Sequence, residues 1–299
     1  MIDISYRIFD LVVSTNSLTK TAEIVHLTPS AVSHSLRKLE QTLGMQLVIR
    51  GRDGVKLTQA GRELLPHVRY TMKAEERLQQ EVSRITGSRA GELHVGVFSS
   101  VGCNWMPEIM RRMERDYPQI ELHIHQYGYA GLEDGVANGE LDTAFVSLPV
   151  SETVPTYPLL RDRLLCITPK GFETANEGYI TIEEMRDQTM ILPHTQSDYD
   201  ARAFMEANGM SADTPHELAD DALIISMVES GHGISVIPEL VLAYLGGDIN
   251  IYPIESAPFR NIGLATQRNE YVTPAAKLFV RTVLDYVNEQ YPEDQPYFR

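Results

Sequence analysis

The sequence predicts a chain of mixed α+β and α/β class, made of a winged helix-turn-helix, a long linker helix and a larger α/β part. Three observations lead to this prediction. Three short helical patterns and a glycine-bounded hairpin come first, an amphipathic stretch follows, and apolar strands then alternate with helices. A chain of 299 residues is also long for one compact domain. We therefore expect three units, at residues 1–58, 59–87 and 88–299.

Three short helices open the chain. Apolar residues at helical spacing between residues 4 and 12 predict the first, and a second is expected over residues 18–26. Thr28 followed by Pro29 is typical of an N-cap and of proline at the first helical position. The third helix should therefore start there and end at Gly44, because glycine readily adopts the left-handed conformation that closes a helix.

A hairpin and a long helix follow. Residues 47–50 and 55–57 have strand character and flank the turn Gly51-Arg-Asp-Gly54, which completes the winged helix-turn-helix. From residue 58 to 86 apolar positions recur at helical spacing over a length that exceeds an average helix. Such a helix buries its apolar stripe against another helix, so we expect it to carry dimerisation. Gly87-Ser-Arg-Ala-Gly91 then has the composition of a linker.

Beyond residue 91, strands and helices alternate, as in α/β sheets with helices on their faces. The expected strands are 93–98, 120–124, 141–146, 164–168, 189–192, 234–237 and 261–266. The expected helices are 105–115, 132–138, 200–208, 220–229 and 273–288.

The charge of the chain is unevenly distributed. The net charge is −15, yet residues 1–87 carry 12 Lys or Arg and 9 Asp or Glu and are therefore net positive. A basic end on an acidic chain is typical of a nucleic-acid-binding module joined to a different kind of domain. The chain lacks both a long apolar stretch and the start of a signal peptide, so we expect a cytoplasmic protein without membrane contact. Two separate cysteines, Cys103 and Cys166, predict neither a disulfide scaffold nor a zinc site.

Several motifs resemble those of the LysR-type transcriptional regulators. Over residues 1–65 they are Phe9-Asp-Leu-Val-Val13, Ser17-Leu-Thr-Lys-Thr-Ala22, Thr28-Pro-Ser-Ala-Val-Ser33, Leu39-Glu-Gln-Thr-Leu-Gly44 and Leu57-Thr-Gln-Ala-Gly61. Further along they are Tyr117-Pro118, Asn138-Gly-Glu-Leu-Asp142 and Gly231-His-Gly-Ile-Ser-Val-Ile-Pro238. Two adjacent positions depart from the family, which has Gln and Pro where this chain has Pro29 and Ser30, so a base contact from position 29 is not expected.

The resemblance implies a ligand-responsive regulator. It would bind an interrupted palindrome in double-stranded DNA as a homodimer or homotetramer, and RNA polymerase is a further partner. The C-terminal domain would have two lobes and resemble type 2 periplasmic binding proteins, with lobe 1 at 91–161 and 267–299 and lobe 2 at 162–266. A small-molecule effector would lie between the lobes. The resemblance implies no cofactor.

The third helix would then enter the major groove with its exposed face toward the bases. Ser30, Ser33, His34 and Arg37 share one face, and Thr28 stands at its start. Hydroxyl groups and arginine are adaptable partners for base edges and phosphates. Arg50, Arg52 and Lys56 belong to the hairpin, where they would contact phosphates or the adjacent minor groove.

The effector site is expected where strands end and helices begin. Ser99, Ser100, Val101 and Gly102 follow the first strand of the α/β part and offer hydroxyl and backbone donors, which suits a carboxylate or another small anion. By resemblance, Ser147 and Thr195 also belong to this cleft. Thr195 lies in the similar array His194-Thr-Gln-Ser197, and Asp220-Asp221 would either cap a helix or face the cleft.

Three alternatives remain open at this stage. Cys103 follows the cleft loop, so a redox-responsive regulator is one alternative. A small-molecule binding or transport protein is another, although the winged helix and the missing signal peptide argue against it. His123 and His125 share one strand face, a spacing that suits a metal or a pH-sensitive interface, but we expect no metal site because no carboxylate-rich set accompanies them. The sequence shows no nucleophile, base and orienting residue in catalytic order, so we expect no enzyme.

Overall fold

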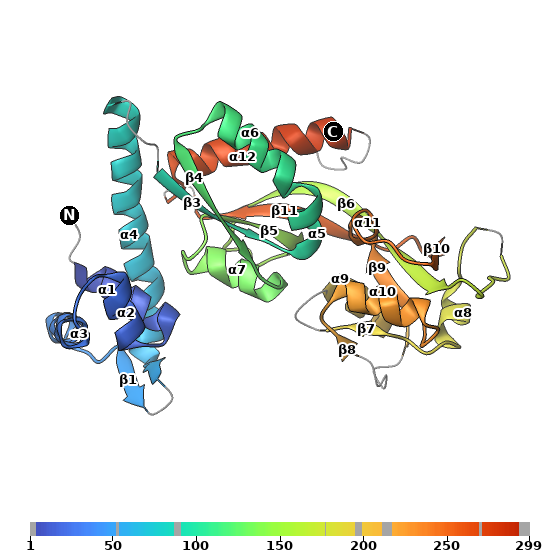
Figure 1. Cartoon of the computed structure of the whole chain (residues 1–299), viewed down its shortest axis with the longest axis horizontal. Helices are drawn as coiled ribbons and strands as arrows, with labels where there is room; N and C mark the ends of the chain where they lie inside the picture. Colours follow the sequence, from blue (N-terminus) through green and yellow to red (C-terminus); the bar gives the residue numbers. More distant parts are fainter. Residues whose placement is uncertain are drawn as a thin grey trace.

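The computed structural model describes residues 4–51, 54–86, 91–176, 178–194, 199–210, 217–268 and 271–292. An N-terminal head is followed by one long helix and by two lobes that extend away from it (Figure 1). The head contains α1 (Ile4–Thr15), α2 (Leu18–Ile24), α3 (Pro29–Leu43), β1 (Val48–Gly51) and β2 (Gly54–Leu57). This is the winged helix-turn-helix that the sequence predicts.

Local signals set both ends of α3. The Thr28 side chain accepts a hydrogen bond from the Ala31 backbone N–H (3.2 Å), and Pro29 occupies the first turn. Gly44 ends the helix with a φ of +69°. Between these ends, Val32 and Leu36 are fully buried against α1 and α2. The opposite face of α3 is therefore left to solvent.

The β1–β2 hairpin is fixed to the helices of the head by backbone hydrogen bonds to side chains. Glu40 of α3 accepts from the backbone N–H groups of Leu47 (2.8 Å) and Val48 (3.2 Å). Asn16 accepts from the backbone N–H of Val55 (2.7 Å). The hairpin is therefore held both to α3 and to the residue that follows α1.

The long helix α4 (Gln59–Thr86) joins the head to the lobes and accommodates Pro66 within it. Arg69, whose side chain is buried, donates from Nε to Asp10 Oδ1 of α1 (2.6 Å) and from Nη1 to Asn138 Oδ1 of the first lobe (2.8 Å). Lys73 Nζ lies 2.9 Å from Asp142 Oδ1, also in the first lobe. The helix is thus tied by polar contacts to both of its neighbours.

Lobe 1 has a sheet with helices on both faces. Its strands are β3 (Gly91–Val97), β4 (Ile120–Gln126), β5 (Thr143–Leu148) and β11 (Phe259–Thr266), together with the first half of β6 (Thr156–Pro169). Its helices are α5 (Ser99–Asn104), α6 (Met106–Asp116), α7 (Tyr129–Ala137) and α12 (Pro274–Gln290). Strand β3 pairs in parallel with β4 and β5, and β11 lies antiparallel between β5 and β6. α6 and α12 lie over one face of the sheet and α7 over the other (Figure 1).

Lobe 2 is built on the second half of β6, which passes from one lobe into the other. Strands β9 (Ser235–Pro238) and β10 (Ile249–Pro253) pair with this half. The remaining elements are α8 (Ile182–Arg186), β7 (Leu192–Pro193), α9 (Tyr199–Ala207), β8 (Glu217–Leu218), α10 (Asp221–Glu229) and α11 (Glu239–Leu242). Two apolar cores, one on each side of the sheet, hold these elements together.

The division between the lobes differs from the expected one at β11. We expected residues up to 266 in lobe 2, but Ile262, Leu264 and Ala265 are fully buried in the core of lobe 1. The reason is that the chain crosses back between the lobes before β11 and not after it. The crossing strand β6 is also much longer than the expected 164–168. Among the described residues, no helix is long and apolar enough to span a membrane.

Candidate functional site

The exposed face of α3 carries the side chains that the sequence predicts for DNA contact. Ser30, His34 and Arg37 are exposed, and Ser33 is half-buried at the edge of the same face. The Thr28 hydroxyl lies 2.9 Å from the Ser30 hydroxyl, so the cap of the helix and its first outward residue form one polar end. This face can present hydroxyl groups, an imidazole and a guanidinium to a groove.

The hairpin adds a second group of cations. Lys56 on β2 is exposed. Arg50 lies on β1, but the position of its side chain is not described, and Arg52 lies outside the described residues. Glu40 holds the hairpin to α3. A contact between Lys56 and the DNA backbone would therefore also set the orientation of the exposed face of α3 on the DNA.

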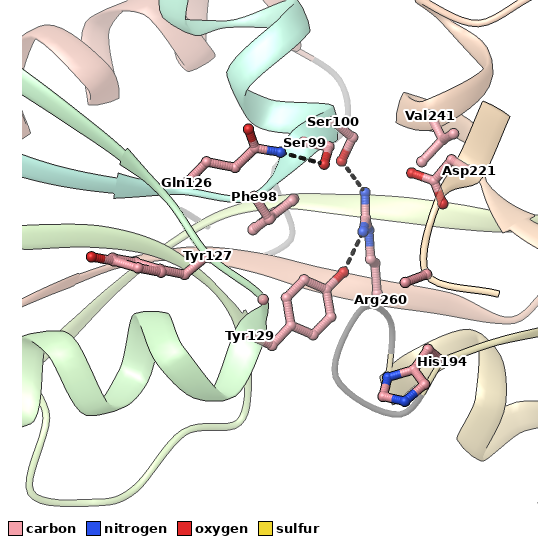
Figure 2. A pocket seen from close by; sticks show the side chains of 12 residues that line it. Phe98, Ser99, Ser100, Gln126, Tyr127, Tyr129, His194, Asp221, Val241 and Arg260 are labelled. Carbon is pink, nitrogen blue, oxygen red and sulfur yellow. Dashed lines mark hydrogen bonds between the residues drawn. The ribbon is translucent and has the colours of Figure 1, made fainter. Parts of the chain in front are cut away.

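A pocket of about 480 Å³ lies between the two lobes (Figure 2). The residues that line it come from α5 and the residue before it, from the end of β4 and the start of α7 in lobe 1, from lobe 2, and from β11. They are Phe98, Ser99, Ser100, Gln126, Tyr127, Gly128, Tyr129, His194, Ala219, Asp221, Val241 and Arg260. Gln126 Nε2 donates to the Ser99 hydroxyl (3.0 Å), which orients both side chains at the mouth of the pocket.

Arg260 is the centre of this pocket. Its side chain is 2% exposed and its guanidinium donates to Asp162 Oδ2 (2.8 Å), to the Ser100 hydroxyl (2.8 Å) and to the Tyr129 hydroxyl. The same group lies over the Phe98 ring, 5.1 Å from its centroid. Figure 2 shows Ser100 and Tyr129 converging on the guanidinium from lobe 1.

The Arg260–Asp162 pair lies where the chain passes between the lobes. The two residues are directly opposite each other in the β11–β6 ladder. Asp162 also accepts from the backbone N–H of Leu240 (3.1 Å) at the start of α11. Burial raises the pKa of Asp162 more than the neighbouring guanidinium lowers it. Arg260 therefore belongs both to the pocket and to the strands that pass between the lobes.

Comparison with known proteins places the chain in one family. The family model for the LysR substrate binding domain matches residues 86–288, and that for the bacterial regulatory helix-turn-helix protein of the lysR family matches residues 5–62. The chain belongs to the LysR family of transcriptional regulators. As a member of that family it is a DNA-binding transcriptional regulator with an effector-binding domain.

Relatives and solved structures match nearly the whole length of the chain. The uncharacterized helix-turn-helix regulator YvbU of Bacillus subtilis is 25% identical over 280 residues, which cover 92% of this chain and 94% of YvbU. The full-length structure of an OxyR variant from Pseudomonas aeruginosa has a TM-score of 0.77 at 23% identity and covers 96% of this chain and 95% of that one. The full-length CbnR structure complexed with its target DNA has a TM-score of 0.55 at 18% identity, with coverages of 96% and 100%.

Of the residues expected in the effector cleft of this LysR regulator, some line the pocket and others do not. Ser99 and Ser100 line the pocket. Val101 is fully buried in the core of lobe 1, and Gly102 lies near Val97, because successive residues of a helix face in different directions. These two are not among the lining residues of the pocket.

Ser147 lies between the two lobes. Ser147 donates to Asp200 Oδ2 of α9 (2.6 Å), so it joins the two lobes without lining the pocket. Thr195 lies outside the described residues. Asp221 lines the pocket, whereas Asp220 caps α10 by accepting from the Leu223 backbone N–H (3.1 Å).

Sequence reasoning missed Arg260, Tyr129 and Gln126. Arg260 is separated from Ser100 by 160 positions in the chain, and only the pairing of β11 with β6 brings it to the pocket. The one available signal was that Arg260 stands at the start of an apolar strand. A charged residue that is buried in such a strand needs a partner.

The two cysteines lie in different lobes. Cys103 is exposed on α5, and Cys166 is buried in the part of β6 that belongs to lobe 2. Burial raises the pKa of the Cys166 thiol, which keeps it protonated and unreactive.

Proposed function

We propose that this LysR regulator reads DNA with the exposed face of α3. Ser30, Ser33, His34 and Arg37 would face the base edges, and Thr28 would lie at the phosphate backbone. Lys56, with Arg50 and Arg52, would contact phosphates beside the groove. The observation that carries the proposal is the polar, outward face of α3 opposite the buried Val32 and Leu36. The relative CbnR, whose fold is similar, has been solved with its target DNA.

The exposed apolar residues of α4 support a dimer. Leu78 is 60% exposed and Val82 is 45% exposed on this helix, although both are apolar. A second copy of α4 would cover them, as in a helical pair. A two-fold dimer presents two recognition helices, so the operator would be an interrupted palindrome with half-sites on one face of the DNA. We assign DNA binding to residues 1–58, dimerisation to 59–87 and effector binding to 88–299.

The pocket between the lobes suits a small carboxylate. The Arg260 guanidinium and the hydroxyl groups of Ser99, Ser100 and Tyr129 gather on its lobe 1 side and would orient an anionic group. Asp221 borders the other side, where it would accept from a donor group of the same ligand. Because both lobes contribute to the pocket, such an effector would favour their closed arrangement. The protein would act by binding alone, without catalysis, in the cytoplasm.

Gel-shift titration on DNA from upstream of its own gene, repeated at rising salt, tests DNA recognition. We expect a preferred site that outcompetes random duplex at every salt concentration. Equal affinity for random duplex under all conditions would contradict sequence-specific recognition.

Thermal unfolding of the full chain with a panel of small carboxylates tests the effector site. A ligand at about 100 times its dissociation constant stabilises the folded state by about 2.7 kcal/mol. Ser100→Ala should weaken the stabilisation by the ligand that is found, and Ser151→Ala, on an exposed loop, should not. If both variants respond as the wild type does, the ligand lies elsewhere.

A further inference from the structure

Three histidines and two glutamates gather on one face of the lobe 1 sheet. The parallel pairing of β3 with β4 sets Glu92 beside Glu121 and His94 beside His123, and places His125 beside Gly96. Because side chains alternate between the two faces of a strand, these residues share one face. The His94 ring stacks on His123 with centroids 4.9 Å apart and on His125 with centroids 5.2 Å apart.

Three of these side chains hold their donor atoms close together, and His94 lies beside one of them. One ligand atom from each of Glu92, Glu121 and His123 lies within 4.8 Å of the others. His94 Nε2 is 3.9 Å from Glu92 Oε2, and His123 Nε2 is 3.6 Å from Glu121 Oε1. Neighbouring ligands of a tetrahedral zinc ion lie about 3.4 Å apart, given bonds of about 2.0–2.2 Å. The exposed glutamate side chains can close the remaining gap by rotation.

Two features of this group are unfavourable without a cation. Glu92 and Glu121 are like charges directly opposite each other on adjacent strands, which destabilises a sheet. The Nε2 atom of His123 is buried and has no hydrogen-bond partner among the residues that the structure describes. A metal ion between these side chains would offset the repulsion and give the nitrogen a ligand bond.

The fifth side chain orients one of the others. His125 Nε2 lies 3.0 Å from His94 Nδ1, so one of the two nitrogens donates to the other. When His94 Nδ1 is the donor, its Nε2 carries the lone pair and is directed toward the Glu92 side.

We propose that Glu92, His94, Glu121 and His123 bind a divalent transition-metal ion of the zinc class, with His125 as the residue that positions His94. Two imidazoles and two carboxylates favour zinc or its first-row neighbours, whereas magnesium and calcium prefer oxygen ligands alone. The site is separate from the pocket at Arg260, and it does not depend on the effector proposed above.

The position of the site gives it a structural role. The His94 backbone N–H donates to Asp142 Oδ2 (2.8 Å), and the other oxygen of Asp142 pairs with Lys73 of α4. The metal would fix the start of β3 beside this contact. It would therefore strengthen the connection between the linker helix and lobe 1.

Isothermal titration of the full-length, chelator-treated protein with zinc chloride tests the proposal. We expect one saturable site per chain. His123→Ala and His94→Ala should each weaken zinc binding by at least about 100-fold, and His125→Asn should weaken it by about 10- to 100-fold, as for residues that orient a metal ligand. His67→Ala, which removes an exposed histidine from α4, is the matched control and should bind zinc as the wild type does.

Glu121→Gln gives an independent reading, because this exposed side chain can be changed without disturbing the core. It should weaken zinc binding and leave the unfolding temperature of the zinc-free protein unchanged or higher. The proposal is overturned if the wild type shows no saturable zinc binding. It is equally overturned if the His94, His123 and Glu121 variants bind zinc with the affinity of the His67 control.

Discussion

The Ser147 hydroxyl donates a hydrogen bond of 2.6 Å to the carboxylate of Asp200, and this bond joins β5 of lobe 1 to α9 of lobe 2. Ser147→Ala should lower the free energy of unfolding by about 1.5–3 kcal/mol, the range for a hydrogen bond to a charged group. It should also speed hydrogen exchange in α9. The control is Ser151→Ala, whose hydroxyl contacts Thr153 on the surface. Equal exchange in the two variants would show that the bond does not hold the lobes together.

Arg37 and Lys56 should contribute to DNA binding in different ways. Arg37→Ala removes a group from the recognition face, so it should relax base preference at one position, at a cost of about 1–3 kcal/mol. Lys56→Ala should weaken binding to all DNA sequences alike. It should also reduce the slope of log affinity against log salt concentration by about one. Binding-site selection and salt titration distinguish the two, with Lys277→Ala on α12 as the control. The same behaviour in both variants would mean that α3 does not face the bases.

Leu78→Asp should dissociate the dimer. The change places a charge on the exposed apolar side of α4, where a second copy would have to bury it. Gln79→Asp introduces the same group at the next position of the helix, also exposed, and should leave the dimer intact. Sedimentation velocity on both variants measures the outcome. An unchanged dimer in Leu78→Asp would place the interface on another surface.

The buried pair of Arg260 and Asp162 should show strong coupling. Asp162→Leu alone leaves the guanidinium buried without its counter-charge, which costs about 3–5 kcal/mol of unfolding free energy. Arg260→Met combined with Asp162→Leu should cost less than Asp162→Leu alone, because no charge is then left buried. Urea unfolding of the variants measures this difference. A double variant that loses the sum of both single effects would argue against a direct interaction.

Arg69→Met tests whether the linker helix is held by its two neighbours. The guanidinium contacts Asp10 in the head and Asn138 in lobe 1, and its loss leaves the half-buried Asp10 without this partner. We expect a loss of about 1–3 kcal/mol in unfolding free energy. Arg62→Met on the same helix changes an exposed side chain and should cost less than about 0.5 kcal/mol. Similar losses in the two variants would contradict a bridging role for Arg69.

Elements with strong local signals could be predicted from the sequence. The bounds of α3 agree with the prediction because Thr28, Pro29 and Gly44 act within a few residues of the helix ends. Ser99 and Ser100 were placed in the cleft because a strand–helix junction is visible in the sequence, and both line the pocket. Val101 and Gly102 were expected there as well, but they are not among the lining residues. Which residues of a short helix face a pocket depends on packing, which the sequence does not show.

Features that depend on strand pairing could not be predicted. Arg260 meets Asp162 only through the register of β11 on β6. In the same way, the sequence showed His123 and His125 but not their proximity to His94 and Glu92, which requires the parallel pairing of β3 with β4. For this reason the expectation that no carboxylate-rich set accompanies these histidines took no account of Glu92 and Glu121, which lie beside His123.

The contacts of α4 also determine how far a small movement of lobe 1 displaces the ends of this helix. A helix of 28 residues is about 42 Å long at 1.5 Å per residue. Tilting such a rod by about 5° about one end moves the other end by about 4 Å, which is comparable to the rise of one base pair in DNA. Arg69 holds the rod to the head and to lobe 1 about 15 Å from its head end, and Lys73 adds a contact to lobe 1 about one turn farther along. A rearrangement of about an ångström at Asn138 would then move the distant, dimer-forming end of the helix about two to three times as far, and with it the spacing between two recognition helices.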